Sequence, residues 1–587
     1  MTDASETPNT EFSEIADGMR IDWDVPITMD DGIVLRADVY RPVEDGQYPV
    51  IMTLGPYAKG LPFQTGYAGM WRTLETKYPE ILAGSTNKYQ NWETADPEKW
   101  VPDGFICVRV DSRGAGRSPG YLDVYSPRET QDYYECIEWA GVQPWSNGKV
   151  GLLGISYYAV NQWQVASLQP PHLAAICPFE GYQDFYRDCN RHGGILNTFM
   201  LEWYPVQVTS VQYGVGSRGQ VNPNTGVPIA GSVDIDDAEL LANRSDLPTE
   251  LRSHTLDDQW FRDRSATLAN ITVPLLSASN WAHSLHSRGN FEGYLGVSSQ
   301  ERWLEVHGLE HWTEFYTDYG VALQKRFFGH FLRGEDTGWD KQPPVYLKLR
   351  AVDGSFVERA ENEWPLARTN WTEFYPNADG SLSLTPGADG QLEFAALGEG
   401  VSFFTAPLET PLEITGPAAA KLLISSSTTD ADIFIVLRVL APDGSDVSFV
   451  SAQDPRGVIT NGWLRASQRA LDVERSLPYR PWHTHTSSSP LQPGEKVALD
   501  IEIWPTSVLV PAGYRVGITI LGRDFAWEGD GPWPQIYGIN MRGNGIFHHT
   551  DPADRPAAVF AGTTTLHLGG VSPTRILLPV IPARETR

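Results

Sequence analysis

The stretch from Lys149 to Val160 reads K-V-G-L-L-G-I-S-Y-Y-A-V and decides the fold of the first half of the chain. Its apolar run, Val150–Leu153, predicts a buried strand, and the residues from Tyr157 onward are compatible with a helix. Ser156 stands between the two. A serine on a tight turn between a strand and a helix is typical of a nucleophile elbow, although Tyr158 occupies the place of the last glycine in G-x-S-x-G.

Length and charge limit the class of protein. A chain of 587 residues is too long for one core, so we expect about two to four domains. The 45 basic and 73 acidic residues give a net charge of −28, which argues against nucleic acid and anionic membranes as partners. The polar start predicts no signal peptide, and no apolar run reaches the length of a membrane span. Four widely spaced cysteines without a C-x-x-C pair indicate reduced core residues and a cytoplasmic protein.

The first part of the chain alternates strands and helices. Residues 1–18 predict a disordered tail, and a hairpin with a turn at Asp30-Asp31-Gly32 follows. Strand patterns at 48–54, 105–110, 150–153 and 173–178 are interleaved with helical patterns at 130–142 and 157–168. The aromatic-rich segment 58–100 is too long for a plain connection and indicates an insertion near a site. The alternation predicts a parallel sheet with helices on both faces and a site beyond the carboxyl ends of its strands.

Two later segments break this alternation. Residues 187–270 carry helical pieces and a Gly/Pro/Asn-rich loop, which predicts a cap inserted into the sheet domain. Beyond about residue 340, short alternating stretches between Pro/Gly/Asp turns predict an all-β sandwich or jelly roll. The expected domains are a tail (1–18), a sheet domain (19–186 and 271–340), a helical cap (187–270) and a β domain (341–587).

A serine nucleophile needs a base, which is usually a histidine oriented by a carboxylate. Two histidines follow the predicted strand at 302–307. His311 lies in the loop past the strand and is the favoured base, whereas His307 at the strand end is equally compatible with a buried structural role. The backbone amide of Tyr157 is the natural first oxyanion donor, and the hydroxyl of Tyr57 is the candidate second donor.

Several motifs together resemble those of one known family. They are G-P-Y-A-K (55–59), D-S-R-G-A-G-R-S (111–118) and W-S-N-G-K-V-G-L-L-G-I-S-Y-Y-A (145–159), followed by a C-terminal β domain. The chain resembles the cocaine esterase/NonD family, which belongs with the X-Pro dipeptidyl-peptidases and α-amino-acid ester hydrolases. The resemblance implies an α/β-hydrolase fold with a helical cap insertion and a C-terminal all-β jelly-roll domain. It also implies Ser156 as nucleophile, His311 as base, and Tyr57 with the Tyr157 amide as the oxyanion hole.

The triad acid departs from the family pattern. The family's acid follows a strand in a pattern like G-G-W-Y-D, and in this chain His283 occupies the place of that aspartate. Either the acid has moved or the enzyme uses a dyad. Glu180, which follows the strand after the nucleophile, is the preferred replacement. Glu310 adjoins His311, but neighbouring side chains tend to point apart.

These residues predict a serine hydrolase that acts on small-molecule esters or amides through an acyl-enzyme, without a metal or cofactor. Ester hydrolysis is favoured over peptide cleavage because no anionic pair beside the serine is evident for holding a substrate amine. The alternatives are an acyltransferase, an X-Pro dipeptidyl-peptidase-like aminopeptidase and a non-catalytic binding protein. The sequence leaves open whether the β domain covers the cap or joins copies in a homo-oligomer. The candidates for the substrate pocket are Trp163, Trp281, His283 and Trp312.

Overall fold

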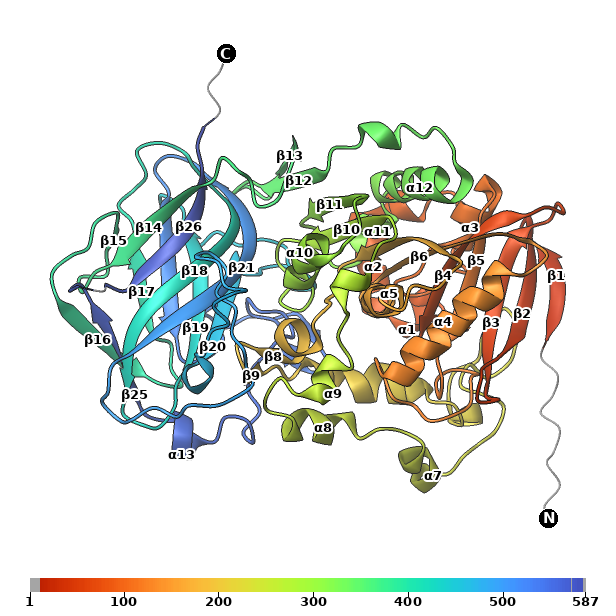
Figure 1. Cartoon of the computed structure of the whole chain (residues 1–587), viewed down its shortest axis with the longest axis horizontal. Coiled ribbons are helices and arrows are strands. Elements are labelled where there is room, and N and C mark those ends of the chain that lie inside the picture. Colours follow the sequence, from red (N-terminus) through yellow and green to blue (C-terminus); the bar gives the residue numbers. More distant parts are fainter. Residues whose placement is uncertain (1–10, 572, 584–587) are drawn as a thin grey trace.

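An eleven-stranded sheet forms the core of the first of two lobes in the computed structural model, which describes residues 11–571 and 573–583 (Figure 1). Its central strands are parallel, whereas its N-terminal strands and its last strand pair antiparallel with their neighbours. In spatial order the strands are β1 (Phe12–Ala16), β2 (Met19–Thr28), β3 (Val34–Pro42), β5 (Ile106–Asp111), β4 (Tyr48–Gly55), β6 (Ser146–Ile155), β7 (Leu173–Phe179), β10 (Leu275–Asn280), β11 (Arg302–His307), β12 (Val345–Arg350) and β13 (Phe356–Glu361).

Helices cover both faces of this sheet because its central strands are apolar on both sides. Successive side chains of a strand point to opposite faces, and in β6 Leu152 and Leu153 belong to two different cores. The core that contains Leu152 includes residues of α4 (Pro127–Gly141) and α5 (Tyr157–Ala166). The core that contains Leu153 includes residues of α12 (Asp318–Arg333). The sheet domain also holds α10 (Ser287–Gly296) and the short α11 (Thr313–Tyr316).

Strands of the first sheet extend beyond both ends of the predicted sheet domain, residues 19–340. The predicted tail contains β1, which pairs antiparallel with β2, while residues 1–10 lie outside the described residues. An edge strand needs few buried side chains, so its sequence carries little apolar signal. Beyond residue 340, β12 pairs with β11 and β13 pairs with β12, so these two strands extend the first sheet. Their short alternating patterns resemble those of the β domain.

The insertion at 58–100 folds into short helices that pack beside the sheet. They are α1 (Phe63–Gly66), α2 (Ala68–Lys77), η1 (Pro79–Leu82) and α3 (Pro97–Trp100). Its aromatic rings pack against one another, with Tyr67 and Trp92 stacked at 4.4 Å between centroids. This packing fixes the backbone around Trp92 and therefore the position of the next residue, Glu93.

The cap consists of short helical pieces and one small hairpin. The pieces are η3 (Phe185–Asn190), β8 (Arg191–His192), β9 (Ile195–Leu196), α6 (Phe199–Trp203), η4 (Tyr204–Val208), η5 (Thr209–Val211), η6 (Gly216–Arg218), α7 (Asp237–Ala242), α8 (Leu247–Ser253), α9 (Gln259–Arg262) and η7 (Leu268–Asn270). Asp184 caps the first of them by accepting hydrogen bonds from the backbone of Tyr186 and Arg187.

The second lobe is an antiparallel β structure around a large apolar core, with a second buried apolar cluster beside it. Its strands are β14 (Asn370–Pro376), β15 (Leu382–Ser383), β16 (Gly390–Ala395), β17 (Val401–Phe404), β18 (Leu412–Ser426), β19 (Asp432–Leu440), β20 (Thr460–Arg465), β21 (Val497–Val510), β22 (Arg515–Leu521), β25 (Thr563–Leu568) and β26 (Arg575–Ile581). A separate hairpin, β23 (Gln535–Ile536) and β24 (Ile539–Asn540), and α13 (Ala557–Phe560) also belong to this lobe.

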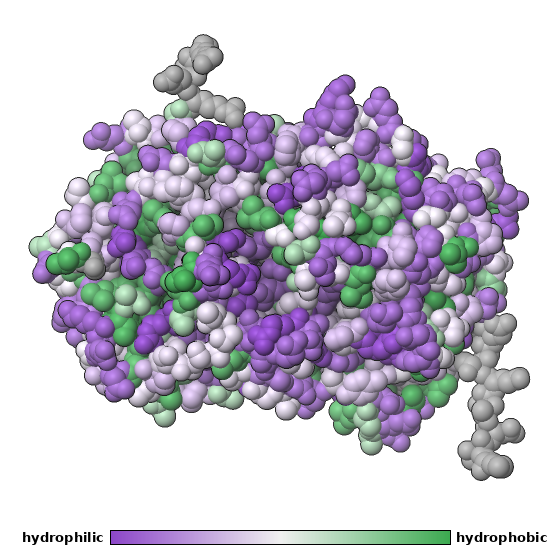
Figure 2. Space-filling model, in the orientation of Figure 1, coloured by the Kyte–Doolittle hydropathy of each residue, from purple (hydrophilic) through white to green (hydrophobic). Residues whose placement is uncertain are grey.

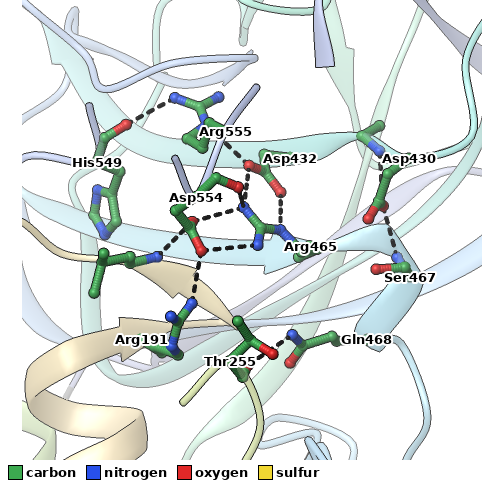
Figure 3. A network of polar contacts seen from close by, with 12 residues as sticks. Arg191, Thr255, Asp430, Asp432, Arg465, Ser467, Gln468, His549, Asp554 and Arg555 are labelled. Carbon is green, nitrogen blue, oxygen red and sulfur yellow. Dashed lines mark hydrogen bonds and ion pairs between the residues drawn. The ribbon is translucent and has the colours of Figure 1, made fainter. Parts of the chain in front are cut away.

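A buried ionic network joins the cap to the β lobe (Figure 3). Arg465 of β20 contacts Asp432 at 2.9 Å and Asp554 at 2.8 Å, and Arg191 of β8 contacts Asp554 at 2.7 Å. Arg555 completes the network through Asp432 at 2.9 Å. Burial opposes the charge of Asp554, but the two arginines outweigh it and lower its pKa to about 2. The β lobe and the cap are therefore joined by buried ion pairs between charged side chains.

Hydrophilic residues cover most of the face shown in Figure 2, with hydrophobic residues scattered in small groups. Within the described ranges, no helix has the length and apolar character needed to cross a membrane. All four cysteines are free and buried.

Candidate active site

Ser156 occupies the turn between β6 and α5 in a strained backbone conformation. Its φ is 57° and its ψ is −115°, which a non-glycine residue adopts only when the surroundings impose it. The backbone amide of Ser156 donates to the carbonyls of Phe179 and Glu180, each at 3.1 Å. These contacts with the end of β7 hold the turn at the carboxyl edge of the sheet, as the nucleophile elbow predicts.

Close packing around the turn explains its small residues and the missing last glycine. A Cβ at Gly154 would lie 2.4 Å from the Cβ of Tyr158, and a Cβ at Gly181 would lie 2.5 Å from the Cβ of Ala159. Tyr158 itself fits because Gly55 leaves room for its ring. A Cβ at Gly55 would lie 2.5 Å from Cε1 of Tyr158. The G-P-Y motif thus compensates for a tyrosine at the fifth elbow position.

The structure brings Glu180 and His311 together. Glu180 Oε2 lies 2.9 Å from His311 Nδ1, and Glu180 Oε1 lies 2.9 Å from His307 Nε2. Burial opposes the charge of Glu180, but His311 and His307 outweigh it and lower the pKa of this carboxyl. His307 is also bonded to Glu305 at 2.9 Å, so both of its nitrogens have carboxylate partners. His307 therefore braces Glu180, and Glu180 orients His311.

A second carboxylate, Glu93, was not anticipated from the sequence. Its Oε1 lies 3.0 Å from His311 Nε2, across 218 residues of chain. Burial raises the pKa of Glu93 to about 7. Burial opposes the charge of His311, but Glu180 and Glu93 raise its pKa to about 9. His311 thus lies between two carboxylates in this resting arrangement.

The histidine that contacts the serine is His286, which sequence reasoning also missed. His286 Nε2 lies 3.0 Å from Ser156 Oγ, and His286 Nδ1 accepts a hydrogen bond from the Tyr182 amide at 3.1 Å. His286 stands at the start of α10, and the ring of Tyr182 stacks on it at 5.5 Å. Burial, followed by the charge of His311, lowers the pKa of His286 well below 6.5.

His283, His286 and His311 place one ring nitrogen each within 4.8 Å of the others, a spacing that raises the question of a metal. Their hydrogen bonds do not fit such a site. The Nδ1 atoms of His283 and His286 both accept backbone N–H groups, from Leu285 at 3.2 Å and from Tyr182 at 3.1 Å. A neutral imidazole whose Nδ1 accepts carries its proton on Nε2, and a protonated nitrogen cannot ligate a metal.

The two residues predicted to form the oxyanion hole pack against each other through their rings. The rings of Tyr57 and Tyr157 are 5.8 Å apart, and Trp203 of the cap donates its indole N–H to the Tyr57 hydroxyl oxygen at 3.1 Å. Because that oxygen accepts from Trp203, the Tyr57 proton remains available for another acceptor. Burial raises the pKa of Tyr57 well above 10, so its hydroxyl stays protonated. The Tyr157 amide is in the first turn of α5, where N–H groups lack intrahelical partners.

Two of the three predicted pocket tryptophans donate their indole N–H groups to backbone carbonyls. Trp163 donates to the Gly181 carbonyl at 3.1 Å and Trp281 donates to the Lys348 carbonyl at 2.7 Å. Trp312 packs at 5.6 Å from Trp92, and its indole nitrogen has no hydrogen-bond partner among the described residues. The fourth pocket candidate, His283, places Nε2 3.9 Å from Glu180 Oε2.

The sequence held only a weak signal for the two missed groups. His283 occupies the place of the family's missing aspartate, and His286 follows it three residues later. Glu93 carries no motif. The fold brings it to His311 through the packing of the 58–100 insertion.

The fold and the strained Ser156 turn place this protein among the serine hydrolases of the α/β-hydrolase class. Residues 31–313 match the family described as X-Pro dipeptidyl-peptidase (S15 family), and residues 337–577 match the X-Pro dipeptidyl-peptidase C-terminal non-catalytic domain. A CocE/NonD family hydrolase from Staphylococcus aureus is 30% identical, with a TM-score of 0.81, over 96% of this chain and 94% of that one. The chain belongs to the CocE/NonD hydrolase family.

Two further relatives support the same assignment. The cocaine esterase of Rhodococcus sp. is 25% identical over 95% of this chain and 98% of its own length. An α-amino acid ester hydrolase structure is 17% identical, with a TM-score of 0.66, over 99% of this chain and 100% of that one, which shows the shared fold. The predicted fold class, an α/β-hydrolase domain with a C-terminal all-β domain, is confirmed.

Proposed function

We propose that Ser156 is the nucleophile of this hydrolase and forms an acyl-enzyme with small-molecule esters or amides. His311 takes the hydroxyl proton of Ser156 as the hydroxyl oxygen attacks the substrate carbonyl. Glu180 stabilises the resulting imidazolium through Nδ1. The Tyr57 hydroxyl and the Tyr157 amide donate to the developing oxyanion, His311 then protonates the leaving group, and water releases the acyl group. The 2.9 Å contact between Glu180 and His311 Nδ1 carries this proposal, because it fixes the ring as a base requires.

The resting arrangement must change before His311 can act. Glu93 is hydrogen-bonded to His311 Nε2, the nitrogen that would receive the serine proton. In this proposal Glu93 turns away when substrate enters, and Nε2 then faces Ser156. Hydrogen bonds used in catalysis often form only in the substrate complex, so such a rearrangement is ordinary for this chemistry.

The choice between ester and amide substrates stays open. Ester preference rested on the lack of an evident anionic pair beside the serine, and the structure adds one carboxylate to the site, Glu93, whose Oε1 lies 3.0 Å from His311 Nε2. Relatives include a cocaine esterase and X-Pro dipeptidyl-peptidases, so a substrate panel needs simple acyl esters, α-aminoacyl esters and X-Pro amides. We also propose a cytoplasmic location, which the four free, buried cysteines support.

The decisive experiment compares the wild-type protein with Ser156→Ala. A fluorophosphonate probe should label the wild type at Ser156, and the variant should lose about 10⁶-fold in turnover of a p-nitrophenyl ester. An added amine acceptor distinguishes hydrolysis from acyl transfer, since only a transferase forms the amide as its main product. Unimpaired turnover by the folded Ser156→Ala protein would exclude the nucleophile assignment, and failure of the wild type to label would support a non-catalytic protein.

A further inference from the structure

The contact between His286 and Ser156 has a defined direction. A backbone N–H can only donate, so the Tyr182 amide fixes His286 Nδ1 as a hydrogen-bond acceptor. A neutral ring with an accepting Nδ1 carries its proton on Nε2. That nitrogen lies 3.0 Å from Ser156 Oγ. The N–H of His286 therefore donates to the serine oxygen, the reverse of what a base would do.

The surroundings keep His286 neutral. The side chain is 1% exposed, and the groups packed against it are the ring of Tyr182, the neighbouring His283 and the charged His311. No carboxylate forms an ion pair with its ring among the described residues, in contrast to His307 and His311. A second proton would sit on Nδ1 and face the N–H of Tyr182. Two opposed donors in a buried site are strongly unfavourable.

We infer that His286 is a catalytic hydrogen-bond donor to Ser156 Oγ and that it keeps its proton throughout the reaction. Because Oγ accepts from His286, the hydroxyl proton of Ser156 is directed elsewhere and can point to His311. As that proton moves to His311 Nε2, negative charge grows on Oγ, and the hydrogen bond that His286 Nε2–H donates to Oγ becomes stronger. The same bond stabilises Oγ again when it leaves during deacylation. This inference rests on the proposed function of Ser156 and His311.

A donor and a base respond differently to replacement. Glutamine carries an N–H donor of similar reach but cannot act as a base, whereas alanine supplies neither group. We expect His286→Ala to lower kcat/KM by about 10²-fold, as loss of one preorganised donor does. We expect His286→Gln to recover most of that loss. The acidic limb of the pH profile should be the same in both variants and the wild type, because it reports His311.

The test compares these variants with His311→Ala, using kcat/KM against pH and the rate of fluorophosphonate labelling. If His286 were the base, the glutamine and alanine variants would be equally inactive, and the inference would be overturned. In ¹⁵N-histidine spectra, the wild-type signal that disappears in His286→Gln belongs to His286. At pH 7 this signal should have the chemical shifts of the neutral Nε2–H tautomer. An Nδ1–H tautomer or a charged ring would also overturn it. Retained activity in Ser156→Ala would instead refute the proposed function, so the two failures are distinguishable.

Discussion

Replacement of Glu93 by glutamine tests how two carboxylates set the basicity of His311. The ordinary histidine pKa of 6.5 is raised to about 9 in this site, although burial alone would lower it. Glu180 is the stronger of the two partners that raise the pKa, and Glu93 is the second. Together, Glu180 and Glu93 offset the effect of burial and account for the net rise in the pKa of His311. Removal of the Glu93 charge should therefore lower the pKa of His311 by about one unit, or about 1.4 kcal/mol.

The sign of the effect on activity follows from the role of a base. Only the neutral ring accepts a proton, so activity rises with pH through the pKa of His311. A lower pKa in Glu93→Gln shifts the acidic limb of kcat/KM to lower pH by about one unit. The ratio of the variant's activity to that of the wild type is therefore higher near pH 7 than at high pH. The assay is p-nitrophenyl ester hydrolysis followed from about pH 5 to about pH 10.

A matched control is available one residue from His311. Glu310 is bonded to Lys77 and Tyr78, each at 2.8 Å, and not to the His311 ring. Glu310→Gln should leave the acidic limb where it is in the wild type. An unmoved limb in Glu93→Gln, or a limb displaced to higher pH, would refute the reasoning that Glu93 raises the pKa of His311.

Three further outcomes follow from the contacts of the site and the lobe junction. Glu180→Gln should fold normally but lower kcat by about 10⁴-fold, because the His311 ring loses the carboxylate that stabilises its charged form. A loss below about tenfold would show that another residue serves as the triad acid. Tyr57→Phe should lower kcat by about 10²-fold or more with little change in KM, measured on the same ester, and an unchanged kcat would remove Tyr57 from the oxyanion hole. Arg465→Met leaves buried carboxylates with fewer partners and should lower the free energy of unfolding by about 3–5 kcal/mol in urea titrations. The exposed pair Arg523–Glu399 is the control, since Arg523→Met should cost less than about 1 kcal/mol.

The elbow shows how far local sequence reaches. An apolar strand, a small turn and a helix start are encoded within a dozen residues, so Ser156 and the Tyr157 amide could be recognised before the fold was known. The sheet, the cap and the β lobe were also predictable, because hydrophobic period and turn residues are local signals. The pairing of β12 and β13 with the first sheet could not be predicted, because these strands carry the same short alternating pattern as the β lobe.

The groups around His311 depended on contacts between distant segments. Glu180 could be proposed because parallel strands end at one edge of the sheet, where β7 lies between β6 and β10. Its hydrogen bonds to two histidines, and the burial that sets the direction of each pKa, required the packed structure. Glu93 could not be proposed at all, because its position depends on aromatic packing within an irregular insertion.

The sequence by itself determined the class of protein, the serine and the histidine proposed to serve it, because these follow from short patterns of strand, turn and helix. Only the tertiary structure decided which groups meet. It brought Glu93 and Glu180 to opposite nitrogens of His311, and it placed His286 Nε2 3.0 Å from Ser156 Oγ. The physical reason is that hydrogen-bond direction and charge state depend on burial and on partners from other parts of the chain. No local pattern encodes either of them.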